Sequence, residues 1–224
     1  MRANIYTTIV LIDDNSPDDT ATVAQELQKE LKTKRFIIQV LSNMQKSGLG
    51  QAYVRGFQYA LQQDYDAIMQ MDADLSHNPS YLPIMLTAFN QADMVIASRY
   101  IPGGATPNWK LLRRLASRGG NWYARLFLGD RLTDYTGGFN LYAATLLRKL
   151  DITTIQASGY TFQVELKQRA LQQCKEVCEI PIVFTERKYG RSKIPRSTIA
   201  HTLVLIPKLW LQTLFQGYKI TTSE

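Results

Sequence analysis

The sequence has little cysteine, little histidine and no long hydrophobic run. Its two cysteines, Cys174 and Cys178, have no second pair to bond with and make no metal-binding pattern, so we expect structural thiols on the reducing, cytosolic side of a membrane. His77 and His201 lack the second histidine or carboxylate at the spacing of a zinc site. The start of the chain lacks the apolar segment of a signal peptide, so we expect no secretion.

A length of 224 residues, with 45% hydrophobic and 20% charged residues, is typical of one compact domain with a buried core. The net charge of +7 predicts an anionic partner, which can be nucleic acid, a phospholipid surface or a phosphorylated substrate. The cations gather in two segments rich in long aliphatic residues: Lys110, Arg113, Arg114, Arg118, Arg125 and Arg131, and then Arg187, Lys188, Arg191, Lys193, Arg196 and Lys208.

Short apolar runs and helical patterns alternate in the first 100 residues or so. The runs at 7–13, 36–42, 67–72 and 93–98 indicate buried strands, and the stretches at 18–32, 48–63 and 81–89 indicate helices. A further helix is expected at 162–173. This alternation predicts an α/β fold, with a mostly parallel sheet covered by helices on both faces.

The pair Asp72 and Asp74 follows one of these runs. Residues two apart on a strand point the same way, so one Mg²⁺ or Mn²⁺ ion, together with substrate phosphates, can reach both carboxylates. The alternative is a solvated turn. Since ligands bind beyond the carboxyl ends of parallel strands, and Asp13, Asp14 and Arg99 also stand at such ends, we favour a site for a metal and a diphosphate.

Asp13 and Asp14 are candidates for binding a ribose or a base; the alternative is that they cap the helix at 18–32, and both roles can hold at once. The segment Gly48-Leu49-Gly50 is a weak phosphate loop, because it is short and no lysine follows it. It more simply indicates a tight turn or close packing.

Two apolar stripes flanked by cations predict helices that lie on a membrane surface. The alternative is that both stripes are ordinary core faces. No stretch reaches the ~20 apolar residues of a spanning helix, so we expect a peripheral protein. The first stripe, in the basic amphipathic segment 108–130, comprises Leu111, Leu115, Trp122 and Leu126, and the second comprises Ile199, Leu203, Ile206, Trp210 and Leu214.

A series of motifs resembles the polyprenol-phosphate (dolichol-phosphate) mannose synthases, which are inverting family 2 glycosyltransferases of the Rossmann-like GT-A fold. The matching stretches are I-D-D-N-S-P-D-D-T at 12–20, G-L-G-Q-A at 48–52, M-D-A-D-L-S-H-N-P at 71–79, A-S-R-Y-I-P-G-G at 97–104, N-W-K-L-L-R-R-L-A-S-R-G-G-N at 108–121, T-G-G-F at 136–139, G-Y-T-F-Q-V-E-L at 159–166 and E-R-K-Y-G-R-S-K at 186–193.

The resemblance implies a role for each matching residue. Asp72, Asp74 and Ser76 hold Mg²⁺ or Mn²⁺ on the diphosphate of GDP-mannose. Arg191 and Lys193, in the G-R-S-K block, contact the donor, and Gln163 is a candidate for the sugar, with Glu165 beside it. Three residues hold the phosphate of polyprenyl or dolichyl phosphate: Arg99, Arg113 and Ser117. Asp74, Arg99 and Arg113 are the residues expected to matter most for catalysis.

The same resemblance implies in-line transfer of mannose with inversion at the cytoplasmic face of a membrane, with no strong general base. Residues 1–194 are expected to form the catalytic domain, and 195–224 an amphipathic membrane-surface helix and tail. Small membrane-embedded partner subunits are implied for relatives without spanning helices. Nucleic acid is not an expected partner, because the basic segments alternate with aliphatic stripes and no nucleic-acid motif is present.

One departure concerns the N-terminus. Family members begin with a strand ending in a Pro-Thr-Tyr-Asn-Glu-like loop and a helix, so we expect this chain to lack about 30 residues of the nucleotide-binding start. Other interpretations stay open: a family 2 enzyme that uses another donor such as UDP-glucose, or a truncated binding subunit without catalysis. A receiver-like domain is suggested only by the Asp13-Asp14 pair and does not fit the later motifs.

Overall fold

The computed structural model describes residues 6–31, 33, 35–155, 159, 161–186 and 196–221. The chain divides into two compact units, Met1–Tyr65 and Asp66–Glu224. The predicted boundary between the domain 1–194 and the segment 195–224 lies outside the described residues, as do Arg191 and Lys193.

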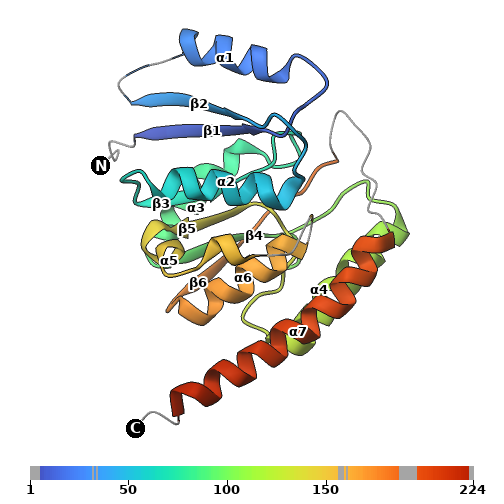
Figure 1. The fold of residues 1–224 in the computed structure, drawn as a ribbon. Helices are drawn as coiled ribbons and strands as arrows, with labels where there is room; N and C mark the ends of the chain where they lie inside the picture. Colours follow the sequence, from blue (N-terminus) through green and yellow to red (C-terminus); the bar gives the residue numbers. More distant parts are fainter. Residues whose placement is uncertain are drawn as a thin grey trace. The chain divides into compact units, whose positions relative to one another are not determined.

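The first unit is a two-stranded parallel sheet with a helix on either side (Figure 1). Strand β1 (Thr7–Asp13) pairs with β2 (Phe36–Ser42) along its whole length, so that Asp13 lies opposite Ser42. Helix α1 (Thr20–Glu30) connects the strands and packs against β2, whereas α2 (Leu49–Leu61) packs against β1. Both strands and both helices were predicted, with the helix ends one or two residues inside the expected ranges.

The second unit contains a four-stranded mixed sheet in the order β3-β5-β4-β6. Strands β3 (Ala67–Gln70) and β4 (Met94–Ser98) lie within predicted runs. Strand β6 (Val177–Pro181) is parallel to β4, whereas β5 (Asn140–Ala143) is antiparallel to both β3 and β4. Neither β5 nor β6 was predicted, and the antiparallel β5 makes this sheet mixed.

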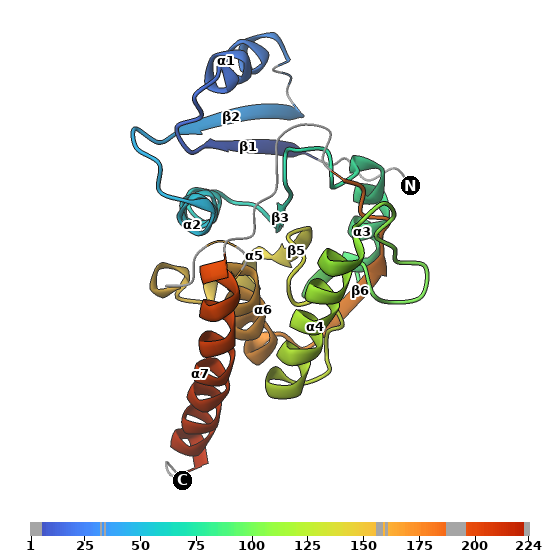
Figure 2. The same ribbon diagram turned by 90° about the vertical axis from the view of Figure 1, so that its right-hand side faces the viewer.

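Helices cover this sheet on both sides, as the alternating pattern predicted. Helix α3 (Leu82–Phe89) and helix α6 (Thr161–Gln173) lie on opposite sides of the strands (Figure 2). Between α3 and the sheet lies a buried apolar cluster: Met85, Val95, Ala97, Phe139, Leu141, Ile180 and Ile182. Shorter elements complete the unit: the helix α5 (Ala144–Arg148) and the 3-10 turns Pro79–Tyr81 and Ile152–Thr154.

Helix α4 (Leu111–Leu128) and helix α7 (Arg196–Thr221) pack against each other (Figure 1). The Tyr123 hydroxyl donates a hydrogen bond to the Leu203 carbonyl oxygen at 3.0 Å, and the Phe127 ring meets the Trp210 ring edge-on. None of the described helices combines the length and apolarity needed to cross a membrane.

The two predicted apolar stripes differ in exposure. All four residues of the α4 stripe are exposed: Leu111, Leu115, Trp122 and Leu126. The neighbouring Leu112 is 81% exposed, so this face of α4 is not packed as core. In α7, Leu203 and Trp210 are exposed but Ile206 is buried, so the second stripe is partly a core face. The side chains of Ile199 and Leu214 lie outside the described residues.

Candidate functional site

The loop after β3 brings together the predicted metal-binding residues. Asp74 accepts two hydrogen bonds on Oδ1, from the Ser76 backbone N–H at 3.0 Å and from the Ser76 hydroxyl at 2.6 Å. The backbone N–H of Asp72 donates to Nδ1 of His77 at 2.9 Å. Burial lowers the pKa of His77, and the neutral ring lets Nδ1 accept this bond, although the charges of Asp72 and Asp74 act in the opposite direction.

Two carboxylates and a hydroxyl are oxygen ligands of the kind that Mg²⁺ and Mn²⁺ prefer. In the part of the chain that the structure describes, no group of three or more His, Cys, Asp or Glu side chains is gathered as metal ligands. These few protein oxygens would leave the rest of the coordination shell to substrate phosphates and water. That division of ligands is the usual one for Mg²⁺, so the residues present fit a divalent cation.

Gln163 lies near this loop. A Cβ built on Gly138 would be 3.6 Å from Gln163 Nε2, 3.7 Å from Asp72 Oδ1 and 3.7 Å from His77 Cε1, so these three side chains surround one glycine. The Gln163 side chain is buried, and its Oε1 accepts a hydrogen bond from Asn140 at 3.3 Å. Its neighbour Glu165 pairs instead with Arg169 on the same helix.

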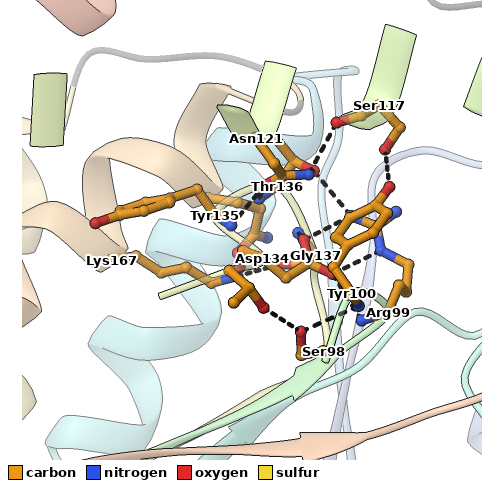
Figure 3. Close-up of polar contacts among 12 residues, drawn as sticks. Ser98, Arg99, Tyr100, Ser117, Asn121, Asp134, Tyr135, Thr136, Gly137 and Lys167 are labelled. Atoms are coloured by element: carbon orange, nitrogen blue, oxygen red, sulfur yellow. Dashed lines mark hydrogen bonds and ion pairs between the residues drawn. The ribbon is translucent and has the colours of Figure 1, made fainter. Parts of the chain in front are cut away.

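Arg99, after β4, forms a buried ion pair with Asp134 (Figure 3). Its Nε and Nη2 donate to the two carboxylate oxygens of Asp134, both at 2.7 Å, and its backbone N–H donates to the same carboxylate at 3.1 Å. Nη2 also donates to the Thr136 hydroxyl at 2.8 Å. One edge of the guanidinium group is therefore already taken by Asp134, although planar forks of this kind also suit phosphate.

Burial raises the pKa of Asp134, but the charge and hydrogen bonds of Arg99 outweigh it and hold the pKa at about 2. Lys167 is buried beside this pair, and its ammonium group donates to the carbonyl oxygens of Asp134 and Gly137, both at 2.8 Å. Burial lowers the pKa of Lys167 to about 8. Arg99, Asp134 and Lys167 thus form a buried charge cluster, and Figure 3 shows its polar contacts.

The loop 133–137 that carries Asp134 is held from several sides. Asn121 Oδ1 on α4 accepts from the backbone N–H groups of Tyr135 and Thr136, at 2.7 and 3.2 Å. Glu179 on β6 accepts from the backbone N–H groups of Thr133 and Asp134. These contacts fix the loop, and with it the orientation of Arg99.

Arg113 at the start of α4 lies over the Trp109 ring, 3.9 Å from its centroid, and Nη1 donates to Glu186 at 3.1 Å. The side chains of Arg113 and Glu186 are 28% and 49% exposed, in contrast to the Arg99 pair. Ser117, one turn further along α4, accepts a hydrogen bond from the Tyr100 hydroxyl at 2.6 Å. The indole N–H of Trp109 is buried and has no hydrogen-bond partner among the described residues.

One aromatic side chain connects these groups. The Phe184 ring lies 5.3 Å from the His77 ring and 5.4 Å from the Trp109 ring, and the Arg99 guanidinium lies 5.6 Å from its centroid. The carboxylate loop and the predicted arginines therefore lie around a common aromatic centre within the second unit.

The loop after Arg99 folds back on its own backbone at Gly104. A Cβ at this position would lie 2.7 Å from the carbonyl carbon of Arg99 and 2.8 Å from the carbonyl oxygen of Ser98. Only glycine fits such an approach, because the crowding atoms belong to the backbone and cannot rotate away. Position 104 thus helps to set the path of the chain beside the arginine.

Asp14 organises the strand ends of the first unit. It accepts hydrogen bonds from the Asn43 side chain, from the backbone and hydroxyl of Ser47, and from the backbone N–H of Gly48. These bonds outweigh the effect of burial and lower the pKa of Asp14 well below its usual range. Gly48 has a φ of +88°, which supports the tight-turn interpretation of its segment.

Asp13 is buried, and its carboxylate accepts from the Ser16 backbone N–H at 3.3 Å. Neither Asp13 nor Asp14 caps α1, since the N-cap residue of this helix is Asp19. The alternative role as a helix cap is therefore wrong. Both residues stay candidates for contact with a ribose or a base.

The sequence interpretation missed the residues that hold the predicted site in place. Asp134, Lys167, Trp109 and Glu186 were not singled out. Asp134 stands two residues before the T-G-G-F block, so its position next to a matched motif was the available signal. Lys167 carries no such signal, because a lysine within a helix is ordinarily exposed.

Comparison with known proteins identifies the family of this chain. A family model described as glycosyl transferase family 2 matches residues 5–151. The chain is 38% identical over 211 residues to an undecaprenyl-phosphate mannosyltransferase of Micrococcus luteus, covering 94% of this chain and 85% of the relative. It is 39% identical over 196 residues to a polyprenol monophosphomannose synthase of Mycolicibacterium smegmatis, covering 87% and 73% of the two chains.

Solved structures resemble the fold at low sequence identity. A glucosyl-3-phosphoglycerate synthase of Mycobacterium tuberculosis, in complex with Mn²⁺, UDP and glucosyl-3-phosphoglycerate, superposes with a TM-score of 0.57 at 17% identity, covering 91% of this chain and 67% of that one. Another structure of that enzyme gives a TM-score of 0.58 at 18% identity, covering 89% and 69%. The predicted GT-A fold and the resemblance to polyprenol-phosphate mannose synthases are confirmed, and the chain belongs to glycosyl transferase family 2.

Proposed function

We propose that this glycosyltransferase moves mannose from GDP-mannose to polyprenyl phosphate, with inversion at the anomeric carbon. One observation carries the proposal: the carboxylate loop at Asp72 and Asp74 and the arginine cluster at Arg99 lie around Phe184. A site that joins two phosphate-bearing substrates needs both a cation-binding group and fixed positive charge. The names of the two curated relatives support the choice of sugar and acceptor.

On the donor side, Asp72, Asp74 and Ser76 would hold Mg²⁺ or Mn²⁺. When bound, the metal neutralises the charge that develops on the leaving diphosphate. Asp13 and Asp14 would contact the ribose or base, and Gln163 the sugar. Two cations of the G-R-S-K block would contact the donor phosphates: Arg191 and Lys193.

On the acceptor side, Arg99, Arg113 and Ser117 would bind the lipid phosphate. Arg113 is the more accessible of the two arginines, because its partner Glu186 is half exposed and a phosphate can replace that carboxylate. Arg99 keeps its bidentate contact with Asp134 and contributes its positive charge. The buried indole N–H of Trp109 is a hydrogen-bond donor beside Arg113 that a phosphate oxygen would satisfy.

No general base is required. The phosphate monoester is already anionic near neutral pH, because its second pKa is about 6. One phosphate oxygen forms the bond to the anomeric carbon, while the bond from that carbon to the diphosphate breaks and GDP leaves with the electron pair. The protein positions two anions that repel each other and screens their charge.

The acceptor is a lipid, so the enzyme would work at the cytoplasmic face of a membrane as a peripheral protein. The exposed apolar face of α4, flanked by arginines, supports this placement.

The test is transfer of radiolabelled mannose from GDP-mannose to a short-chain polyprenyl phosphate, with Mg²⁺, with Mn²⁺ and with chelator. Asp74→Ala should abolish both transfer and Mn²⁺ binding, whereas Arg99→Ala should abolish transfer and leave Mn²⁺ binding intact. Lys149→Ala, which removes an exposed cation after α5, is the control and should behave like the wild type. Transfer of glucose from UDP-glucose instead would correct the donor, and transfer from neither donor would favour a binding subunit without catalysis.

A further inference from the structure

A cavity of about 260 Å³ lies beside helix α4, next to the proposed acceptor residues, although none of those residues lines it. Its walls come from α4 and from the loops that follow β4 and precede β5. Six residues line it: Tyr100, Arg118, Asn121, Trp122, Arg125 and Thr133.

The two arginines that line this cavity have no negatively charged partner among the described residues. Among the described residues, the side chains of Arg118 and Arg125 have no hydrogen bond and no ion pair. In contrast, Arg113 on the same helix pairs with Glu186, and Arg131 donates to the backbone carbonyl oxygens of Leu171 and Lys175. Two guanidinium groups that border one cavity without a counterion favour an anionic ligand.

The polar side chains of the inner wall, by comparison, already have hydrogen-bond partners within the protein. The Thr133 hydroxyl donates to Glu179 and shares a hydrogen bond with the Ser98 hydroxyl at 2.8 Å, the Asn121 amide donates to Thr136, and the Tyr100 hydroxyl donates to Ser117. These contacts make a fixed polar floor. The arginines at the rim are therefore the groups that remain for a ligand.

The outer rim of the cavity is apolar. Trp122 lines the cavity and is 65% exposed, and Leu115 and Leu126 are 57% and 63% exposed. Residues 115, 122 and 126 fall on one helical face, and 118 and 125 lie beside them, because seven residues are close to two turns. A ligand that matches both parts has an anionic head and apolar chains.

We propose that this cavity binds the phosphate of an anionic membrane phospholipid, at a position separate from the acceptor site at Arg99, Arg113 and Ser117. The proposal rests on the peripheral membrane placement in the proposed function and makes it specific for lipid charge. With the headgroup held by Arg118 and Arg125, Trp122 and its apolar neighbours lie at the level of the acyl chains. Helix α4 is then fixed at the depth where a lipid acceptor presents its phosphate to Ser117.

The test measures sedimentation with vesicles of phosphatidylcholine alone and of phosphatidylcholine with phosphatidylglycerol, at low salt. The variant is Arg118→Ala/Arg125→Ala. The matched control is Lys29→Ala/Lys149→Ala, which removes two exposed cations from α1 and from the end of α5. Wild type and control should bind the anionic vesicles, and the arginine variant should bind them roughly thirtyfold more weakly, from the typical contribution of one membrane-adjacent arginine taken twice.

Two further measurements identify the anion. Inorganic phosphate at the same concentration as the lipid phosphate should not displace the protein from vesicles, because the apolar side chains at the rim add binding energy only for a ligand with acyl chains. Displacement would assign the cavity to free phosphate and overturn the proposal. Transfer to a short-chain acceptor without vesicles should keep its KM in the arginine variant, and a raised KM would assign the cavity to the acceptor instead.

Equal vesicle binding by the variant and the control also overturns the proposal. If even the wild type ignores anionic vesicles while mannose transfer proceeds, both the cavity and the membrane placement are wrong, but the transfer reaction stands. If the wild type binds anionic vesicles more tightly than the arginine variant does but transfers no mannose, the proposed reaction is contradicted and the lipid cavity stays supported.

Discussion

Replacing Asp134 with asparagine would test the buried ion pair directly. The substitution keeps the side-chain volume, so it creates no cavity, but it leaves the Arg99 guanidinium without its counterion. Asp134 is 0% exposed and Arg99 is 9% exposed, so water does not compensate. Removing one partner of a buried pair typically costs about 3–5 kcal/mol of unfolding free energy. At about 2–4 °C per kcal/mol for a chain of this size, the Tm should fall by roughly 6–20 °C.

The pH dependence supplies a second, independent measurement. The pKa of Asp134 is about 2 in the folded protein and near 3.8 in the unfolded chain. As the pH falls, the unfolded chain therefore binds this proton first. The stability that the carboxylate contributes is therefore present above pH 3.8 and is lost as the pH falls toward 2. The difference between wild type and Asp134→Asn should stay constant at weakly acidic pH and should shrink as the pH falls below 3.8.

Urea unfolding of both proteins, monitored by circular dichroism at several pH values, measures these differences. Glu186→Gln provides the control, because it breaks an arginine–carboxylate pair of the same chemistry at an exposed position. Its unfolding free energy should stay within about 0.5 kcal/mol of the wild type. The reasoning is refuted if Asp134→Asn is as stable as this control, since the pair would then contribute nothing to the fold.

Three further predictions concern the lipid acceptor and the metal. Glu186→Gln should lower the KM for the lipid acceptor several-fold, because it releases Arg113 for phosphate; an unchanged KM would show that the carboxylate does not compete. Trp109→Phe keeps an aromatic face under Arg113 but removes the buried N–H, so it should raise the acceptor KM. The Tm should fall as well, because the smaller ring leaves a cavity at this buried position, and a lowered Tm with an unchanged KM would assign that group to the fold. Ser76→Ala removes the hydroxyl that donates to Asp74, so Mn²⁺ affinity, followed by electron paramagnetic resonance, should fall about ten- to a hundredfold; unchanged affinity would show that Asp74 needs no support.

The elements that sequence reasoning predicted are those with strong local patterns. β1 and β2 are continuous β-branched and apolar runs, as parallel strands usually are, and their predicted bounds are confirmed. β5 is four residues long, begins two residues after Gly138 and leads directly into α5, so it gives no period to recognise. Its antiparallel pairing with β3 and β4 depends on contacts between distant segments, which composition does not reveal.

In the candidate site, too, residues within local motifs could be predicted from the sequence, whereas contacts between distant segments could not. Motifs identified Asp72, Asp74 and Arg99, because each stands at the end of a strand within a matched block. The partner of Arg99 could not be predicted, since 35 residues separate it from Asp134 and nothing local marks which carboxylate a buried arginine will meet. The sequence predicted an apolar face on α4 and left open whether it is a core face. The structure shows that this face is exposed.

The crowding at Gly104 has a consequence for how the protein tolerates change. A library of random substitutions should lose every variant at this position, because any side chain must displace the backbone of Ser98 and Arg99. Gly119 and Gly120 in α4 form the opposite case, since a Cβ there would meet no atom within 4 Å. Alanine at either position should survive selection and stabilise the helix by about 0.5–1 kcal/mol. The freedom to vary is thus unequal among glycines of one chain, and it follows the backbone contacts around each of them.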